Sequence, residues 1–281
     1  MSTKAASTRP GIVGAILDSL ATFYERRWLV KYLVQRQMAR SYRVSHLGMI
    51  WAFLAPLFMV AMLTVLFSQV LGIKFRTVAG DSSLNFGLFL YCGLLPFLIY
   101  AQALSMGVNV IRKNSNFVRD VVFPLEILPL TTMVTSLFQS LLGVGALMTV
   151  LMVLEHRLHL TVLLLPLIMI PQLLFVLGLT YLMAVIGTYV PDIRETLRAV
   201  VRATFFMTPI LFPTGKVPPS LRFLVDYNPL AYLVNTYRAL ILEGDMPGLQ
   251  STIYFSLFAA AIFIVGLVVF NRVKRNFADL I

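Results

Sequence analysis

Charged side chains are scarce in this sequence. Only 12% of its 281 residues are Asp, Glu, Lys or Arg, whereas 59% are hydrophobic and the mean hydropathy is +0.85. Soluble globular proteins carry about 25% charged residues, so this composition excludes a soluble domain and indicates a chain solvated by lipid. The net charge of +11 would suggest a nucleic-acid partner in a soluble protein. In a membrane protein the basic residues first set the topology, and we expect no nucleic-acid partner.

Several chemical motifs are also absent. No G-x-x-x-x-G-K-[ST] occurs, so the chain has no P-loop of its own to bind ATP. The one cysteine, Cys92, excludes an intrachain disulfide. His156 and His159 have an H-x-x-H spacing without a third visible ligand, so we expect no metal site. No nucleophile elbow and no suitably spaced pair of carboxylates occurs, so the sequence predicts no catalytic residue and no enzyme activity.

Five long windows contain no Asp, Glu, Lys or Arg. They are residues 47–73, 82–111, 127–154, 158–191 and 246–271, and each exceeds the roughly 20 residues that a membrane span needs. Ion-coupled transporters bury charged relays within their spans, so these windows disfavour a pump driven by an ion gradient. A passive channel is disfavoured as well, because no ring-forming charge or filter-like sequence appears. Energy therefore comes from another protein, or from none.

We predict an all-α integral membrane protein with six transmembrane helices and both termini in the cytoplasm. The expected spans are residues 47–73, 84–111, 127–154, 161–190, 194–213 and 250–271. This topology places most of the 23 Lys and Arg residues on the inner side, as the positive-inside rule requires. We expect a cytoplasmic amphipathic region at 1–46, a transmembrane domain at 47–273 and a cytoplasmic tail at 274–281.

Two regions lie outside the spans. Residues 12–44 predict amphipathic helices in the membrane interface, with a basic stripe of Arg36, Arg40 and Arg43. That stripe is either a topological anchor or a site that attracts the diphosphate of a lipid carrier, and the sequence leaves both readings open. Residues 213–249 contain apolar segments too short to span, which predict re-entrant gate helices on the outer side. The expected gate residues are Pro213, Pro218, Asn228, Pro229 and Tyr232.

Three stretches resemble the permeases that export O-antigen, capsule and teichoic acid. They touch most of residues 36–240, in the order of that family. The first stretch is RSYRVSHLG at 40–48, with Trp51 and Pro56. The second is GLLPF at 93–97, with NSNFV at 114–118 and FPLEILP at 123–129. The third is PDIR at 191–194, with TPI at 208–210, NPL at 228–230 and Tyr237-Arg238. The resemblance implies the permease subunit of a type-two ABC exporter in the bacterial plasma (inner) membrane, with an undecaprenyl-diphosphate-linked polysaccharide as substrate.

The same resemblance implies partners and a coupling segment. Two copies of the chain would form a homodimer among membrane lipids and pair with two copies of a separate ATPase subunit. ATP and Mg would be bound by that subunit, and no cofactor by this chain. The cytoplasmic loop after the second span would dock into the ATPase, and residues 192–195 would make a smaller contact. The coupling residues expected are Asn114, Asn116, Phe117, Val118, Arg119, Asp120, Phe123 and Pro124, together with Asp192 and Arg194.

The resemblance also implies a translocation path between two copies, lined by aromatic side chains. The candidates are Trp51, Phe58, Tyr91, Phe97, Tyr100, Phe205, Phe206 and Phe212. Two alternatives stay open at this point. One is a type-two permease for a drug or other small amphiphile, and the other is a membrane transferase or flippase that acts without an ATPase.

Overall fold

The computed structural model describes residue 14 and residues 21–42, 50–66, 74–76, 83–119, 123–154, 156, 158–190, 192–277 and 279–280. Helices make up most of these residues. In chain order the elements are α2 (Arg27–Tyr42), α3 (Ile50–Thr64), β1 (Lys74–Arg76), β2 (Ser83–Asn85), α4 (Phe86–Gly107), α5 (Val110–Lys113), α6 (Ser115–Arg119), α7 (Ile127–Leu154), η2 (Leu160–Leu164), α8 (Leu165–Tyr189), α9 (Ile193–Met207), η3 (Thr214–Lys216), η4 (Pro219–Leu221), α10 (Phe223–Asp226), α11 (Pro229–Arg238), the π-helix η5 (Ala239–Glu243), α12 (Leu249–Val273) and η6 (Lys274–Asn276).

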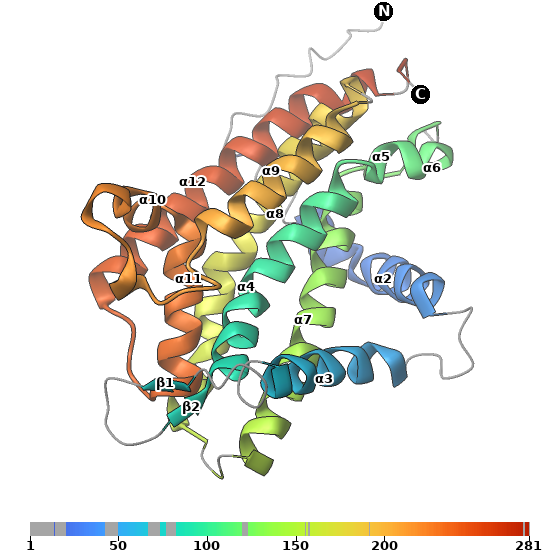
Figure 1. The fold of residues 1–281 in the computed structure, drawn as a ribbon. Coiled ribbons are helices and arrows are strands. Elements are labelled where there is room, and N and C mark those ends of the chain that lie inside the picture. The colour runs from blue at the N-terminus through green and yellow to red at the C-terminus, as the bar shows by residue number, and fades with distance from the viewer. Residues whose placement is uncertain are drawn as a thin grey trace, which may run out of the picture.

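Four of the described helices are long and apolar enough to cross a membrane. They cover Phe86–Gly107, Ile127–Val153, Leu160–Tyr189 and Leu249–Phe277, and they correspond to the second, third, fourth and sixth predicted spans. At 1.5 Å per residue, the 22 residues of α4 extend about 33 Å, which matches the roughly 30 Å hydrocarbon core. Figure 1 shows α4, α7, α8 and α12 side by side in one bundle, so the chain is a multi-pass membrane protein.

The first and fifth predicted spans are not among these four helices. Helix α3 has 15 residues, about 22 Å, and lies crosswise to α7 in Figure 1; both ends of the first predicted span, 47–49 and 67–73, lie outside the described residues. Helix α9 also has 15 residues and ends at Met207 rather than continuing to 213. Its end has a clear cause, because Thr208 precedes Pro209 and takes the extended conformation that a residue before proline prefers.

Two further expectations are corrected. The second span was predicted as one helix to 111, but α4 ends at Gly107, residues 108–109 form a turn and α5 begins at Val110. The all-α prediction also missed a small antiparallel sheet, in which Lys74 faces Asn85, Phe75 faces Leu84 and Arg76 faces Ser83. Three-residue strands are too short to produce a recognisable alternation in the sequence.

Glycines allow the two most closely packed spans to touch. Helices α8 and α12 meet where Gly178 of α8 faces the backbone of Ile262 and Phe263, and a Cβ at Gly178 would lie 2.6 Å from those atoms. A Cβ added at Gly266 of α12 would lie closer still to the carbonyl oxygen of Gly178. Within lipid there is no hydrophobic drive to associate helices, so such close backbone contact supplies much of the attraction.

The N-terminal helix α2 packs on the bundle rather than standing apart. Its Leu33 and Met38 are buried, and α2 contacts α7. On the other side Trp28 and Tyr32 are exposed, as is Tyr24 just before the helix. Exposed aromatic side chains of this kind are common in the headgroup layer, and the placement of this helix in the membrane interface stays a prediction.

Candidate functional site

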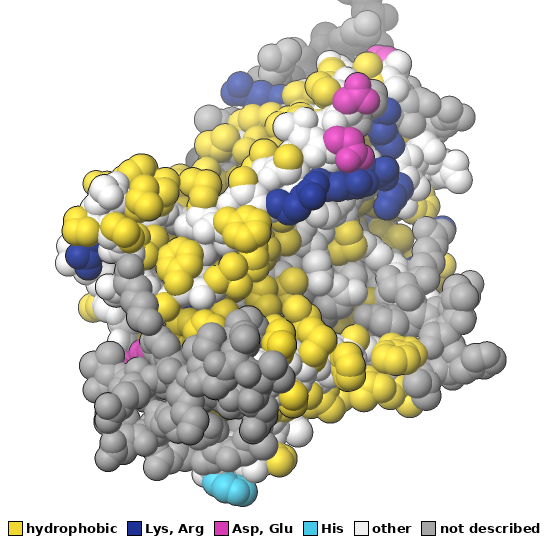
Figure 2. Space-filling model, in the orientation of Figure 1, with side chains coloured by type: hydrophobic (Ala, Val, Ile, Leu, Met, Phe, Trp, Pro, Cys, Tyr) yellow, Lys and Arg dark blue, Asp and Glu magenta, His cyan; other side chains and the backbone are white. Residues whose placement is uncertain are grey.

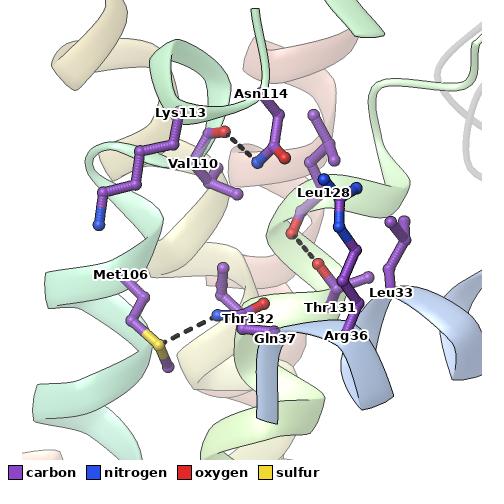
Figure 3. A pocket seen from close by; sticks show the side chains of 10 residues that line it. All are labelled: Leu33, Arg36, Gln37, Met106, Val110, Lys113, Asn114, Leu128, Thr131 and Thr132. Atoms are coloured by element: carbon purple, nitrogen blue, oxygen red, sulfur yellow. Dashed lines mark hydrogen bonds between the residues drawn. The ribbon is translucent and has the colours of Figure 1, made fainter. Parts of the chain in front are cut away.

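A pocket opens at one end of the bundle, where several helices begin or end. Its volume is about 290 Å³, and it lies between α2, the end of α4, α5 and the start of α7. Figure 3 shows the side chains that line it, with Arg36 and Lys113 on different sides. The lining residues are Leu33, Arg36, Gln37, Met106, Val110, Lys113, Asn114, Leu128, Thr131 and Thr132.

The polar walls of this pocket are held by internal hydrogen bonds. The Thr131 hydroxyl donates to the Leu128 carbonyl oxygen at 2.7 Å, and the Thr132 hydroxyl donates to that of Pro129 at 2.8 Å. Asn114 Nδ2 donates to the Val110 carbonyl oxygen at 2.8 Å. These donors are therefore already used within the chain, and they fix the shape of the pocket instead of awaiting a ligand.

The two cations of the pocket, Arg36 and Lys113, differ from these neutral donors because no carboxylate in the described part of the chain pairs with them. None of the described lining residues is Asp or Glu, and within the described part of the chain neither Arg36 nor Lys113 forms an ion pair. Arg36 does lie over the ring of Phe117, with its Cζ 6.0 Å from the ring centroid. The result is a hollow of positive charge at the end of the bundle, which favours an anion.

Only part of the predicted arginine stripe can be located. Arg36 lines the pocket. Arg40 belongs to α2, but its side chain lies outside what the structure describes, as does the whole of Arg43. Sequence reasoning missed Lys113 as a pocket residue, because α3 and α4 separate it from Arg36 along the chain and nothing local links the two.

The predicted coupling segment contains two short consecutive helices, α5 and α6, beyond the end of α4. Arg112 of α5 donates to the Thr188 carbonyl oxygen at the end of α8, at 2.8 Å. In α6 Val118 is buried, and the Phe117 ring stacks on that of Phe123 with centroids 4.5 Å apart. These apolar side chains pack against the core of their own chain, so among the side chains of α6 that the structure describes, that of Asn116 is the exposed one that a partner could reach.

The remaining coupling candidates are placed as follows. Pro124 is half-buried, while Asp192 and Arg194 are exposed at the start of α9. The Arg119 side chain and Asp120 lie outside the described residues. The C-terminal end braces the same loop, because Lys274 Nζ pairs with Glu126 Oε2 at 2.9 Å and Glu126 is buried.

The aromatic candidates separate into distinct groups. Phe97 and Tyr100 of α4 are buried, and Phe97 contacts Phe205 of α9 edge to face, with ring centroids 5.4 Å apart. Phe205 in turn contacts Phe206, whose side chain is 66% exposed. Trp51 and Phe58 lie exposed on α3, Phe212 is half-buried beyond α9, and Tyr91 is buried against α7 near Gly143. The eight residues therefore do not line one surface of a single chain.

Helix α9 carries exposed arginines at membrane depth. The Phe97–Phe205 contact places Phe205 level with the middle of α4, and Arg202 lies three residues before it, about 4.5 Å along the helix. Both Arg198 and Arg202 are exposed. Figure 2 shows charged side chains over α9 bordered by hydrophobic surface. A charge in hydrocarbon costs about 2.5–3.5 kcal/mol, so this face of α9 suits water better than lipid.

The segment after α9 folds back onto the bundle around a buried arginine. Arg238 donates from its two terminal nitrogens to the carbonyl oxygens of Pro209 at 2.6 Å and Ile210 at 2.7 Å, and from Nε to that of Phe89 at 3.3 Å. Its Cζ lies 3.5 Å from the centre of the Phe89 ring. Burial lowers the pKa of Arg238 to about 10, so it remains charged at neutral pH.

The predicted gate residues belong to the same segment, between the end of α9 and Arg238. Asn228 caps α11 by accepting from the Leu230 amide at 2.9 Å, and its Nδ2 donates to the Thr208 hydroxyl at 3.1 Å. Pro229 takes the first position of α11, where a proline is tolerated. The Tyr232 hydroxyl donates to that of Thr252 on α12 at 2.8 Å. Pro213 is half-buried and Pro218 exposed.

Comparisons with known proteins agree with this architecture. Residues 29–242 match the family model described as ABC-2 type transporter. The chain is 26% identical over 258 residues to an O-antigen export system permease protein RfbA of Myxococcus xanthus, covering 91% of this chain and 96% of that protein. It is 25% identical over 255 residues to an RfbA of Klebsiella pneumoniae, covering 90% and 95%. It is also 24% identical over 255 residues to the polysialic acid transport protein KpsM of Escherichia coli, covering 89% and 95%. With most of its length matched by the family model, the chain belongs to the ABC-2 type transporter family.

Proposed function

We propose that this chain is the transmembrane subunit of an ABC transporter that exports a lipid-linked polysaccharide, such as O-antigen or a similar surface glycan, across the bacterial plasma membrane. The observation that carries the proposal is its similarity, over 91% and 90% of its length, to two proteins named as O-antigen export permeases. A separate ATPase subunit supplies the energy, since the sequence has no P-loop. The chain itself then holds no ATP, no Mg and no catalytic residue.

The translocation path in this proposal runs between two copies of the chain. The exposed arginines of α9 support it, because Arg202 lies at a depth where a lipid-facing charge is unfavourable. A second copy would shield the apolar residues beside them, including Phe206, while water fills the space between. In this arrangement α3 and α9 are the first and fifth of six spans, although each helix has 15 residues.

Coupling to the ATPase uses α6 and the start of α9. Both lie at the same end of the bundle as the pocket, and Asn116, Asp192 and Arg194 are exposed there. That end is cytoplasmic in the proposed topology, with both chain termini on the same side. The outer gate is formed by α10, α11 and the loop that Arg238 holds, at the opposite end of the path.

Two other functions share parts of this evidence. A type-two permease for a drug or other small amphiphile has the same family fold and an ATPase partner, but it would not need a polysaccharide. A transferase or flippase that acts alone would need no ATPase at all. The names of the relatives favour polysaccharide export over both.

The test is co-purification of the tagged chain with a candidate ABC ATPase subunit from the same organism. We expect a stable complex with the wild-type chain and its loss with Asn116→Arg, because Asn116 is exposed on α6. The matched control is Ser220→Arg, which places the same charge at an exposed position of η4 on the outer side. If no ATPase is recruited under any condition, the exporter proposal is wrong. If a complex does form, the amount of surface glycan on a strain from which this chain is deleted distinguishes polysaccharide export from drug export.

A further inference from the structure

We propose that the pocket between α2, α5 and α7 binds the phosphate group of the lipid-linked substrate, and that Arg36 and Lys113 are its ligands. This inference rests on the proposed function, since it names where that substrate is first held. The inference extends the proposed function by adding Lys113, which belongs to the coupling segment. It thereby adds a physical link between substrate binding and the ATPase contact.

The charges of the pocket favour a phosphate. Arg36 is half-buried and Lys113 is exposed at the rim, and no described lining residue carries a negative charge. Their neutral neighbours Asn114, Thr131 and Thr132 already donate to backbone carbonyls. The two cations, which lie on different sides of the pocket, are thus the strongest donors left to a ligand, and both arginine and lysine are common phosphate ligands.

The position and size of the pocket favour a lipid headgroup. Met106 is one residue from the end of α4 and Leu128 is the second residue of α7, so the pocket lies at the level where the spans end. Leu33, Met106 and Leu128 give it an apolar side on which the first units of a lipid chain can lie. Its volume of about 290 Å³ is at the lower limit for small-molecule pockets. It therefore has room for a phosphate or diphosphate, but not for a polysaccharide.

The link to coupling follows from chain connectivity. Lys113 ends α5, Asn114 is the turn, and α6 begins at Ser115. Arg36 from α2 already contacts the Phe117 ring of α6. An anion held between Arg36 and Lys113 therefore restrains α6 relative to α2. If α6 is also the ATPase contact, substrate binding and ATPase docking must influence each other equally, because coupling free energies are reciprocal.

The experiment measures binding of radiolabelled farnesyl diphosphate to the purified full-length chain in phosphatidylcholine nanodiscs. We expect Arg36→Gln and Lys113→Gln each to weaken binding about tenfold, the value of one charged hydrogen bond. Arg36→Lys should retain part of the affinity, because charge is kept while the fork is lost. The control is Arg275→Gln, which removes the same charge from an exposed position near the C-terminus.

Competition identifies the source of the phosphate. Farnesol should not displace the probe, whereas a prenyl diphosphate should. If phosphatidylglycerol displaces it equally well, the pocket is a general lipid-headgroup site and the substrate assignment is wrong. Binding that is unchanged in both glutamine variants overturns the inference altogether. Because this assay needs no ATPase, its failure is separate from failure of the proposed exporter function.

The coupling claim has its own readout in the complex with the ATPase. We expect farnesyl diphosphate to raise ATP hydrolysis by the wild-type complex, and Lys113→Gln to abolish this rise even at saturating ligand. A rise that persists in the saturated variant would leave the phosphate site in place and contradict its link to α6.

Discussion

The contacts of Arg238 allow one prediction with a worked magnitude. The side chain is 3% exposed, and among the described residues it meets no carboxylate within 4 Å. Its two shortest hydrogen bonds, to Pro209 and Ile210, hold the loop that follows α9. The change Arg238→Met keeps a long side chain and removes every donor.

The expected loss is the difference between two opposing effects. Each buried carbonyl left without a donor costs about 1–3 kcal/mol, so losing the two short bonds costs about 2–6 kcal/mol. Removing the charge relieves part of the cost of burying a guanidinium. We therefore expect Arg238→Met to lower the free energy of unfolding by about 2–4 kcal/mol.

Gly93 provides the second half of the test. A Cβ added there would lie 2.6 Å from an Arg238 terminal nitrogen and 3.2 Å from Val234 Cγ1. Gly93→Ala should therefore displace the guanidinium and cost about 1–3 kcal/mol, although alanine is the better helix former. With methionine at 238 the flexible thioether can move aside, so the same substitution should cost at least about 1 kcal/mol less.

The assay is reversible unfolding in mixed detergent micelles, for the wild type, both single variants and the double variant. Gly145→Ala is the matched control, because its added Cβ has no neighbour closer than 3.8 Å and should be neutral or stabilising. If Gly93→Ala costs the same in both backgrounds, the guanidinium is not the group it displaces and the reasoning fails.

Three further predictions concern other parts of the chain. Gly266→Leu should separate α12 from the backbone of α8 and lower the free energy of unfolding by more than about 2 kcal/mol; a neutral result in detergent unfolding would refute the close contact. Burial raises the pKa of Glu243, so the folded state keeps this proton to higher pH than the unfolded state does. Its contribution to stability should therefore fall as pH rises above the ordinary carboxyl range, and Glu243→Gln should remove that slope; identical slopes in the two proteins would contradict it. In a Cys92→Ala background, Arg202→Cys should react quickly with a charged thiol reagent in membranes and Phe258→Cys on α12 slowly; equal rates would show that α9 faces lipid.

The hydrophobic windows were informative because membrane insertion depends on local composition. The prediction for residues 127–154 coincides with α7, and the second, fourth and sixth spans are each confirmed as membrane-length apolar helices. A run of about 20 apolar residues must satisfy its own backbone hydrogen bonds, so length and composition alone dictate a helix. The family resemblance was also available from local motifs, and the family model matches residues 29–242.

Tertiary structure decided what depends on contacts between distant segments. The sequence shows Arg238 and Gly93 as separate motif residues, but only packing reveals that the glycine leaves room for the arginine. In the same way Arg36 was recognised within a basic stripe, whereas Lys113 joins it only because α2, α5 and α7 converge. Phe117 and Val118 were expected to face a partner, yet they pack into their own chain. The reason is that removing apolar surface from water is favourable whether the apolar neighbour belongs to the same chain or to a partner. Hydrophobicity is a local property that adds along the chain, while charge pairing and close contact depend on geometry that no local pattern records.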